Sequence, residues 1–222
     1  MPPTPTSLAS VIVPTYNRSG LLARALDSAL SQTHSALQVI VVDDGSTDDT
    51  ETLVKTQYLT DTRVEYVYQT NQRVAGAKNT GIAHARGSYI TFLDSDDAYE
   101  PDHIALRAAH MDEHLDIDAI HGGFRPVNGG YMVPDYYMPG QMFDLRGGHL
   151  GPTLFMRAHV PATVGGFIHR DYGDDTEFFE RVTNTVRTAR VDWPTYLYFR
   201  DSPDGIVNDE QMRRDTSSSQ PQ

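Results

Sequence analysis

Cysteine is absent from the 222 residues of this chain. Its absence excludes disulfide frameworks, thiol nucleophiles, iron–sulfur clusters and cysteine-ligated zinc, so any metal must be held by oxygen or imidazole. Basic residues are also scarce, because 18 stand against 30 acidic ones for a net charge of −12. This balance argues against nucleic acid or an anionic membrane surface as a partner of the whole fold.

Long apolar runs are missing as well. None approaches the ~18 residues that a transmembrane helix requires, so no membrane span is expected. The start of the chain, MPPTP, lacks the cationic and apolar regions of a signal peptide. A hydrophobic content of 39% is still enough for the core of one α/β domain. We therefore expect a soluble cytoplasmic protein.

The first hundred residues alternate short apolar runs with amphipathic segments. The apolar runs predict strands at residues 8–13, 37–42, 64–68 and 89–93. The amphipathic segments predict helices at residues 21–30 (capped by Asn17 or Ser19), 47–59, 75–85 and from Pro101 onward. This alternation predicts an α/β fold with a mixed, mostly parallel sheet and helices on both of its faces.

The pattern changes after about residue 117. Residues 119–124 and 131–133 flank a turn rich in Gly and Asn, which predicts a hairpin. Residues 134–151 are rich in Gly, Tyr, Met and Pro and are expected to form a long loop. A helix from about Thr176 and a strand near residues 193–199 follow. The aromatic side chains of that strand are expected to serve packing.

Acidic and polar residues gather where the predicted strands end. The first strand leads into residues 14–18, the second into residues 43–48 and the fourth into residues 94–97. Ligands bind at this edge of open parallel sheets, although Asp, Asn, Ser and Gly are also ordinary turn residues. Two acidic strand ends in one sheet repel each other unless a cation or a ligand lies between them. Asp94 and Asp96 suit Mg²⁺ or Mn²⁺, which take carboxylate, water and phosphate oxygens.

Six segments occur in a recognisable order: VIVPTYNR (11–18), VVDDGSTDDT (41–50), NQRVAGAKNTGI (71–82), FLDSDDAY (92–99), VGGF (164–167) and GDDTEFFERV (173–182). Together they resemble the family 2 glycosyltransferases of the GT-A fold, which is Rossmann-like, over roughly residues 8 to 200. The resemblance implies one catalytic domain, residues 1–202. Its nucleotide-binding half would span about residues 8–100 and its acceptor-side half residues 101–202. The polar residues 203–222 are expected to form a disordered tail.

The resemblance also implies roles for individual residues. Asp44 would accept the N3–H of uracil, and Asp94 would lie near the ribose and the metal. Asp96 would be the direct metal ligand, with the adjacent Asp97 ranked third after Asp96 and Asp94. Asp175 matches the second residue of the family's acidic pair, which is the catalytic base. The remaining positions expected to contact the donor are Pro14, Tyr16, Asn71 and Lys78.

Three positions depart from the family pattern. Arg73 stands where the family usually has glycine, and Lys78 where it usually has arginine, so the planar fork of the guanidinium is lost. Many relatives also have a histidine a few residues after the last strand, and none follows Phe199. If that histidine binds the metal or the diphosphate, His149 or His169 would have to replace it. The simpler interpretation, which we favour for each, is an ordinary solvated loop residue.

The acidic segment at residues 173–182 has a second interpretation. Asp174 and Glu177 have the spacing of a capping box, so both aspartates could belong to a helix start. On that interpretation Asp174 and Asp175 are structural. The resemblance favours a catalytic Asp175, with Asp174 as the structural residue.

The activity that the resemblance implies is that of a metal-dependent, inverting glycosyltransferase. The expected donor is a nucleotide sugar, UDP-hexose or UDP-HexNAc, and the acceptor hydroxyl belongs to a growing glycan, a lipid-linked saccharide or a small metabolite. The acceptor or a partner would then hold the protein peripherally at the inner face of the membrane.

Two other functions remain open. The first is a non-catalytic nucleotide-sugar-binding protein of the same fold, against which the presence of Asp96 and Asp175 argues. The second is a sugar nucleotidyltransferase. That class would need a Gly-rich phosphate loop after the first strand, and residues 14–17 do not resemble one.

Overall fold

The computed structural model describes residues 7–135, 137–138, 140–170 and 173–200, so the expected tail at residues 203–222 lies outside the described part. A seven-stranded sheet forms the centre of the fold. All of its strand pairs are parallel except the two made by β10 (Phe155–Arg157), which runs antiparallel to both of its neighbours. In spatial order the strands are β11 (Thr188–Arg190), β6 (Ala119–His121), β10 (Phe155–Arg157), β4 (Tyr89–Phe92), β1 (Ala9–Thr15), β2 (Leu37–Asp43) and β3 (Val64–Tyr68).

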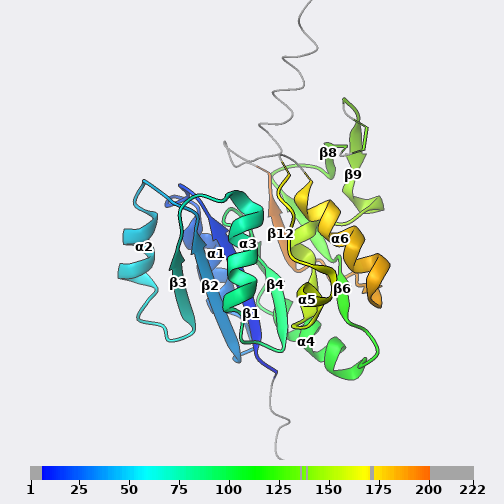
Figure 1. The fold of residues 1–222 in the computed structure, drawn as a ribbon, viewed down its shortest axis with the longest axis horizontal. Coiled ribbons are helices and arrows are strands. Elements are labelled where there is room, and N and C mark those ends of the chain that lie inside the picture. Colours follow the sequence, from blue (N-terminus) through cyan, green and yellow to red (C-terminus); the bar gives the residue numbers. More distant parts are fainter. Residues whose placement is uncertain (1–6, 136, 139, 171–172, 201–222) are drawn as a thin grey trace, which may run out of the picture.

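Helices cover both faces of the sheet, as the alternation of strands and helices predicts (Figure 1). Side chains on β1 alternate between the two cores, so that Val11 and Val13 face one and Ile12 faces the other. The first core is closed by α1 (Leu22–Leu30), α2 (Thr50–Gln57) and α4 (His103–Glu113). The second is closed by α3 (Arg73–His84), α5 (Val160–Val164) and α6 (Asp174–Thr185). Within the described ranges, no helix has the length and apolar character needed to cross a bilayer.

The predicted hairpin at residues 119–124 and 131–133 is wrong. Gly122 and Gly123 have φ angles of +93° and +71°, which end β6 and turn the chain out of the large sheet. The next strand, β7 (Phe124–Val127), joins a small sheet in the order β5-β12-β7, with β5 (Ala98–Tyr99) and β12 (Tyr196–Phe199).

The segment at residues 134–151 is also more structured than expected. β8 (Met132–Pro134) pairs antiparallel with β9 (Met142–Asp144) rather than with β6. Two short 3₁₀ helices follow, η1 (Leu145–Gly147) and η2 (Gly151–Thr153). Short pairs of this kind carry too few periodic residues to be recognised from sequence.

The N-cap residues of α1 and α6 are not the ones that the sequence predicts. The N-cap of α1 is Leu21, so neither Asn17 nor Ser19 caps it. The N-cap of α6 is Gly173, whose φ of +83° suits glycine, and no capping box forms there. Glu177 instead pairs with Arg181 one turn later, with 2.6 Å between Oε1 and Nε.

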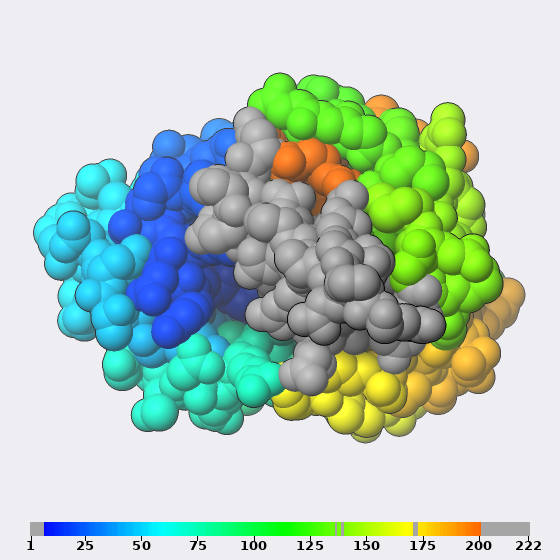
Figure 2. All heavy atoms as spheres, turned by 90° about the horizontal axis from the view of Figure 1, so that it is seen from above, coloured from blue at the N-terminus to red at the C-terminus, as the bar shows by residue number. Residues whose placement is uncertain are grey.

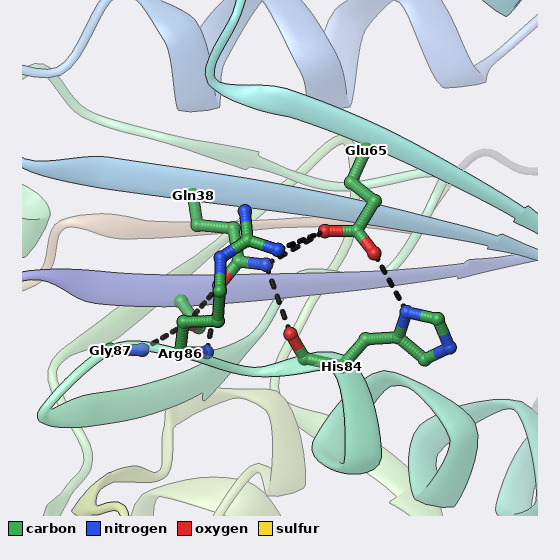
Figure 3. Close-up of polar contacts among 6 residues, drawn as sticks. Gln38, Glu65, His84, Arg86 and Gly87 are labelled. Carbon is green, nitrogen blue, oxygen red and sulfur yellow. Dashed lines mark hydrogen bonds and ion pairs between the residues drawn. The ribbon is translucent and has the colours of Figure 1, made fainter.

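A polar network that begins at the buried side chains of Ser10 and Gln38 and reaches the surface at Arg86 joins the amino ends of three strands (Figure 3). Gln38 on β2 is its centre: Oε1 accepts from Ser10 Oγ (2.7 Å) and from Arg86 N (2.9 Å), while Nε2 donates to Glu65 Oε2 (3.0 Å). Glu65 on β3 also contacts His84 Nδ1 at 2.7 Å and Arg86 Nη1 at 2.7 Å. The network fixes the connection from α3 to β4, at the edge opposite the acidic strand ends.

Candidate active site

The loops after β1 and β2 are joined at the carboxyl edge of the sheet. Asn17, with a φ of +51°, donates its N–H to Ser46 Oγ at 2.9 Å and accepts from Thr47 N through Oδ1 at 2.7 Å. Pro14 is buried in β1, and Tyr16 is exposed just beyond that strand. The neighbouring loop thus fixes the shape of the segment that follows these two expected donor-binding residues.

Asp44 follows β2 and points toward the segment that leads into α3. Its side chain is buried, and Oδ1 accepts from Gln69 Nε2 at 2.6 Å and from Gln72 N at 2.8 Å. Within the described part of the chain, Oδ2 has no hydrogen-bond partner. Asn71 is exposed in the same segment, and its Oδ1 accepts from Arg73 N at 3.2 Å. The arrangement leaves Asp44 one oxygen for an additional N–H donor.

The turn after β4 contains Asp97, whose side chain is 1% exposed. Its Oδ2 accepts from the Tyr196 hydroxyl at 2.6 Å, and its Oδ1 accepts from Phe199 N at 2.8 Å. Burial raises the pKa of Asp97 well above its ordinary value, and the negative charges of Asp94 and Asp96 raise it further. Because both oxygens are engaged, the contacts favour a role in holding the turn, and a metal role for Asp97 stays a prediction.

Asp94 and Asp96 form the remaining part of the expected metal site. Burial raises the pKa of Asp94 to about 7; the Lys78 ammonium opposes this shift, and the charges of Asp175 and Asp96 add to it. A divalent cation would relieve the repulsion among these carboxylates. No group of three or more His, Asp or Glu side chains in the described ranges is arranged to hold a metal ion. Two carboxylates completed by water and diphosphate oxygens are nevertheless usual for Mg²⁺, so the donor set fits Mg²⁺ or Mn²⁺.

Lys78 is a residue of α3, and its side chain is buried against the start of α6. Its side chain is 2% exposed, and its Nζ donates to Asp175 Oδ1 and, at 3.4 Å, to Asp174 Oδ2. Burial lowers the pKa of Lys78, but the charges of Asp175, Asp174 and Asp94 outweigh it and raise the pKa above its ordinary value. Lys78 therefore contacts the acidic pair on α6, and the expected contact with the nucleotide stays a prediction.

Asp175 is the second residue of α6 and lies beside η2. Its side chain is 29% exposed, and Oδ2 has no hydrogen-bond partner among the described residues. Gly151 at the start of η2 lies so close that a Cβ at this position would be 2.5 Å from that Oδ2. Asp174 is more deeply placed, and burial raises its pKa against the opposing charge of Lys78. Of the two carboxylates, Asp175 is the more exposed, at 29% against 13% for Asp174.

The two candidate histidines lie in different surroundings. His149 stacks on Phe179 of α6 with 3.7 Å between ring centroids. Burial lowers its pKa, against the charges of Asp175 and Glu180. His169 is exposed, and its Nε2 lies 3.0 Å from Arg73 Nη1. The replacement of the missing C-terminal histidine by either one stays a prediction.

Sequence reasoning missed two residues that shape the site. The Tyr196 hydroxyl binds Asp97 and lies 3.4 Å from Asp94 N, so a strand interpreted as packing holds the acidic turn. Gly151 makes room for Asp175 without a positive φ, so no turn signal in the sequence marks it. Figure 2 shows this edge from above, with the residues of β1 to α3 (blue to turquoise) beside those of α4 to β12 (green to orange).

The sequence of residues 10–168 matches the family described as Glycosyl transferase family 2, so the chain belongs to this family. It is 40% identical over 119 residues to an uncharacterized glycosyltransferase of Rickettsia felis, across 54% of this chain and 19% of the relative. It is 36% identical over 136 residues to a chondroitin synthase of Escherichia coli, across 58% of this chain and 20% of the relative. The chain thus spans about a fifth of the length of these relatives.

Solved structures show that the fold is that of the GT-A glycosyltransferases. Staphylococcus aureus TarS 1–349 in complex with UDP-GlcNAc superposes with a TM-score of 0.74 at 24% identity, covering 90% of this chain and 60% of TarS 1–349. The mannosyltransferase PcManGT from Pyrobaculum calidifontis, in complex with GDP-Man and Mn²⁺, superposes with a TM-score of 0.70 at 21% identity, covering 99% of this chain and 66% of the other. At these identities the likeness concerns the fold.

Proposed function

We propose that the protein is a metal-dependent, inverting glycosyltransferase that uses a UDP-hexose or UDP-HexNAc. The observation that carries the proposal is the meeting of two acidic groups at one edge of the sheet: Asp94 and Asp96 after β4, and Asp175 on α6. They are close enough for the charges of Asp96 and Asp175 to raise the pKa of Asp94. A metal-bound leaving group and a proton acceptor are the two parts that this reaction requires.

Asp94 and Asp96 would hold the divalent cation through their carboxylates. When bound, Mg²⁺ or Mn²⁺ would neutralise the diphosphate leaving group, so no general acid is needed. Arg24 Nη2 donates to the backbone oxygen of Asp96, and the Arg24 guanidinium lies 3.6 Å from the centroid of the Phe199 ring. Together with the bonds of Asp97 to Tyr196 and Phe199, these contacts fix the acidic turn from two sides.

Asp175 would act as the base through Oδ2, the oxygen without a partner in the described part of the chain. The acceptor oxygen forms a bond to the anomeric carbon while the bond from that carbon to the diphosphate breaks. The acceptor proton passes to Asp175, and the nucleoside diphosphate leaves. A single displacement of this kind inverts the anomeric centre.

The choice of uridine depends on Asp44. Its Oδ1 is held by Gln69 and Gln72, and its Oδ2 is left for an N–H donor such as N3–H of uracil. The structural neighbour TarS is in complex with UDP-GlcNAc, whereas PcManGT is in complex with GDP-Man. We choose UDP rather than GDP as the nucleotide of the donor because Asp44 offers a carboxylate acceptor at the expected position.

The acceptor side would be formed by β8, β9 and the described residues between them. Exposed apolar side chains gather there, and aromatic rings in such a surface can stack on a sugar. The similarity to a chondroitin synthase supports a growing glycan as the acceptor, with a lipid-linked saccharide or a small metabolite as the other candidates. The exposed residues are Met132, Tyr137, Met138, Met142 and Phe143.

A thermal-shift panel tests the donor and the metal together. UDP, GDP, dTDP and CDP are each added with Mn²⁺, with Mg²⁺ or with EDTA, because binding to the native state raises the melting temperature. We expect UDP to give the largest shift and EDTA to abolish most of it. Asp96→Ala should abolish the metal-dependent part, whereas Asp192→Ala, at a side chain that is 95% exposed, should not.

The other outcomes contradict separate parts of the proposal. An equal UDP shift in EDTA would remove the metal from it. A clear preference for GDP or dTDP would contradict the role of Asp44. A protein that binds UDP with metal but releases no UDP from any UDP-sugar would be the non-catalytic member of the fold.

A further inference from the structure

The chain has two lysines, and their environments are opposite. Lys55 is 52% exposed on α2 and pairs with Glu51 one turn away. Lys78 is 2% exposed, and its partners Asp174 and Asp175 lie nearly a hundred residues later in the chain. An ammonium group is costly to bury without compensating charge, so its place in the interior depends on this acidic pair.

The contacts of Lys78 with the two carboxylates are unequal. Its Nζ donates to Asp175 Oδ1 in a close contact, while Asp174 Oδ2 is 3.4 Å away. The ammonium also lies 4.9 Å from the centroid of the Phe167 ring, which covers it from the side of the 164–167 segment. The side chain is therefore held against one oxygen of Asp175.

Asp175 is confined on its other side as well. A Cβ at Gly151 would lie 2.3 Å from Asp175 Cγ and 2.5 Å from Oδ2, so only glycine leaves the Asp175 side chain its present position. Oδ1 is thus fixed by a charge-assisted hydrogen bond, and Oδ2 remains beside the backbone of η2. A cation at this position binds one carboxylate oxygen of Asp175 and leaves the second available.

We propose that Lys78 is a positioning residue for the base: it holds Asp175 by Oδ1 so that Oδ2 accepts the acceptor proton, and it does not bind the nucleotide. The inference rests on the proposed function, because it requires Asp175 to be the base. It assigns Lys78 to the chemical step of the reaction. Nucleotide contacts would then come from Asp44 and the residues around it.

The test separates turnover from donor binding. UDP release from UDP-GlcNAc and UDP-glucose by hydrolysis is measured with Mn²⁺, and UDP binding is measured by calorimetry on the same samples. We expect Lys78→Met to lower kcat at least about 100-fold, as loss of a positioned base does, with the Kd for UDP changed less than threefold. Lys78→Arg keeps the charge and should retain kcat within tenfold of the wild type.

Two further variants cover the case in which Lys78→Met does not fold. The double variant Lys78→Met/Asp174→Asn removes one of the carboxylates left without a counter-charge, so it should fold while keeping the low kcat. Gly151→Ala should lower kcat by displacing the whole Asp175 side chain, and leave UDP binding unchanged. A tenfold weaker UDP affinity of Lys78→Met with kcat preserved would overturn the inference, as would a kcat of Lys78→Arg as low as that of Lys78→Met.

The inference and the proposed function fail in different ways. If the wild-type protein releases no UDP from any UDP-hexose or UDP-HexNAc, the proposed function fails and Lys78 is not at issue. If the wild type is active, Asp175→Asn is inactive and Lys78→Met keeps its kcat, only the positioning role is contradicted.

Discussion

Asn79 on α3 exchanges two hydrogen bonds with the backbone of Phe167: its Nδ2 donates to Phe167 O at 2.8 Å, and its Oδ1 accepts from Phe167 N at 2.7 Å. Phe167 in turn stacks on Phe178 of α6 with 4.0 Å between ring centroids. This one amide therefore joins the half of the chain expected to bind the nucleotide to the half expected to bind the acceptor. Because Lys78 precedes Asn79, the same contact fixes the register of α3 against α6.

Asn79→Ala should destabilise the fold by about 1–3 kcal/mol, since it leaves two partly buried backbone groups of Phe167 without partners. The free energy of unfolding in urea measures the loss. Thr80→Ala, the neighbouring position on α3, serves as the control and should change stability by less. An unchanged stability of Asn79→Ala would show that the two halves are held together without this amide.

Arg73 carries a strained backbone at the first residue of α3. Its φ of +63° falls in the left-handed region, which costs a non-glycine residue about 1–2 kcal/mol. The family resemblance places glycine at this position, and the backbone angle supplies the reason. We expect Arg73→Gly to raise the free energy of unfolding by up to about 1 kcal/mol.

The same variant tests whether the Arg73 side chain binds the donor. The side chain is exposed, so the Kd for UDP should change less than tenfold. A larger loss, equivalent to more than about 1.4 kcal/mol, would show that the guanidinium contacts the diphosphate. Asn128→Gly, at a φ of +56° outside the site, is the matched control for backbone relief.

Asp48 makes stability depend on pH. Burial raises its pKa, but hydrogen bonds from Thr50 and Ser19 outweigh this and lower the pKa from 3.8 to about 2. A folded-state pKa below the unfolded value means that the contribution is complete above about pH 5 and is lost as pH falls toward 2. Asp48→Ala should therefore be less stable than the wild type at pH 7, with a difference that shrinks below about pH 4.

Urea unfolding at a series of pH values checks this, with Asp49→Ala at the exposed neighbouring position as the control. A difference between Asp48→Ala and the wild type that stays constant down to pH 2 would contradict the ionic contribution.

Sequence patterns were sufficient for four strands of the large sheet, β1 to β4. Residues 39–42 form a continuous apolar run because β2 is buried on both faces, and such a run is visible without a structure. The order of the motifs was likewise sufficient to predict the family. The strand-end aspartates could be predicted as a group because parallel strands end at one edge.

The contacts between distant segments could not be predicted in the same way. The hairpin failed because the φ angles of Gly122 and Gly123 depend on the contacts around them and carry no period. The capping box failed because Gly173 already begins α6, and Glu177 is then engaged by Arg181. The Lys78–Asp175 pair joins residues 97 positions apart and has no local signal.

We assign different roles to the two aspartates at the start of α6: Asp174 is structural and Asp175 is the base. Asp174 is the more deeply placed carboxylate and lies 3.4 Å from Lys78 Nζ. Asp174→Asn should cost about 1–3 kcal/mol of stability, because it removes one of the two carboxylates that compensate the buried Lys78 ammonium, with a modest effect on turnover. Melting temperature and UDP release from UDP-GlcNAc, measured on the same sample, give the two values. A large loss of turnover at unchanged stability would exchange the roles assigned to Asp174 and Asp175.

The most direct test of the account is the rate of UDP release by Asp175→Asn, measured with saturating UDP-sugar and Mn²⁺ beside its Kd for UDP. Asparagine keeps the shape of the side chain and cannot accept the acceptor proton. We predict a turnover lower by about 10²–10⁴-fold, with UDP affinity and melting temperature nearly those of the wild type. A folded Asp175→Asn protein that binds UDP and turns over at close to the wild-type rate would contradict the assignment of the base.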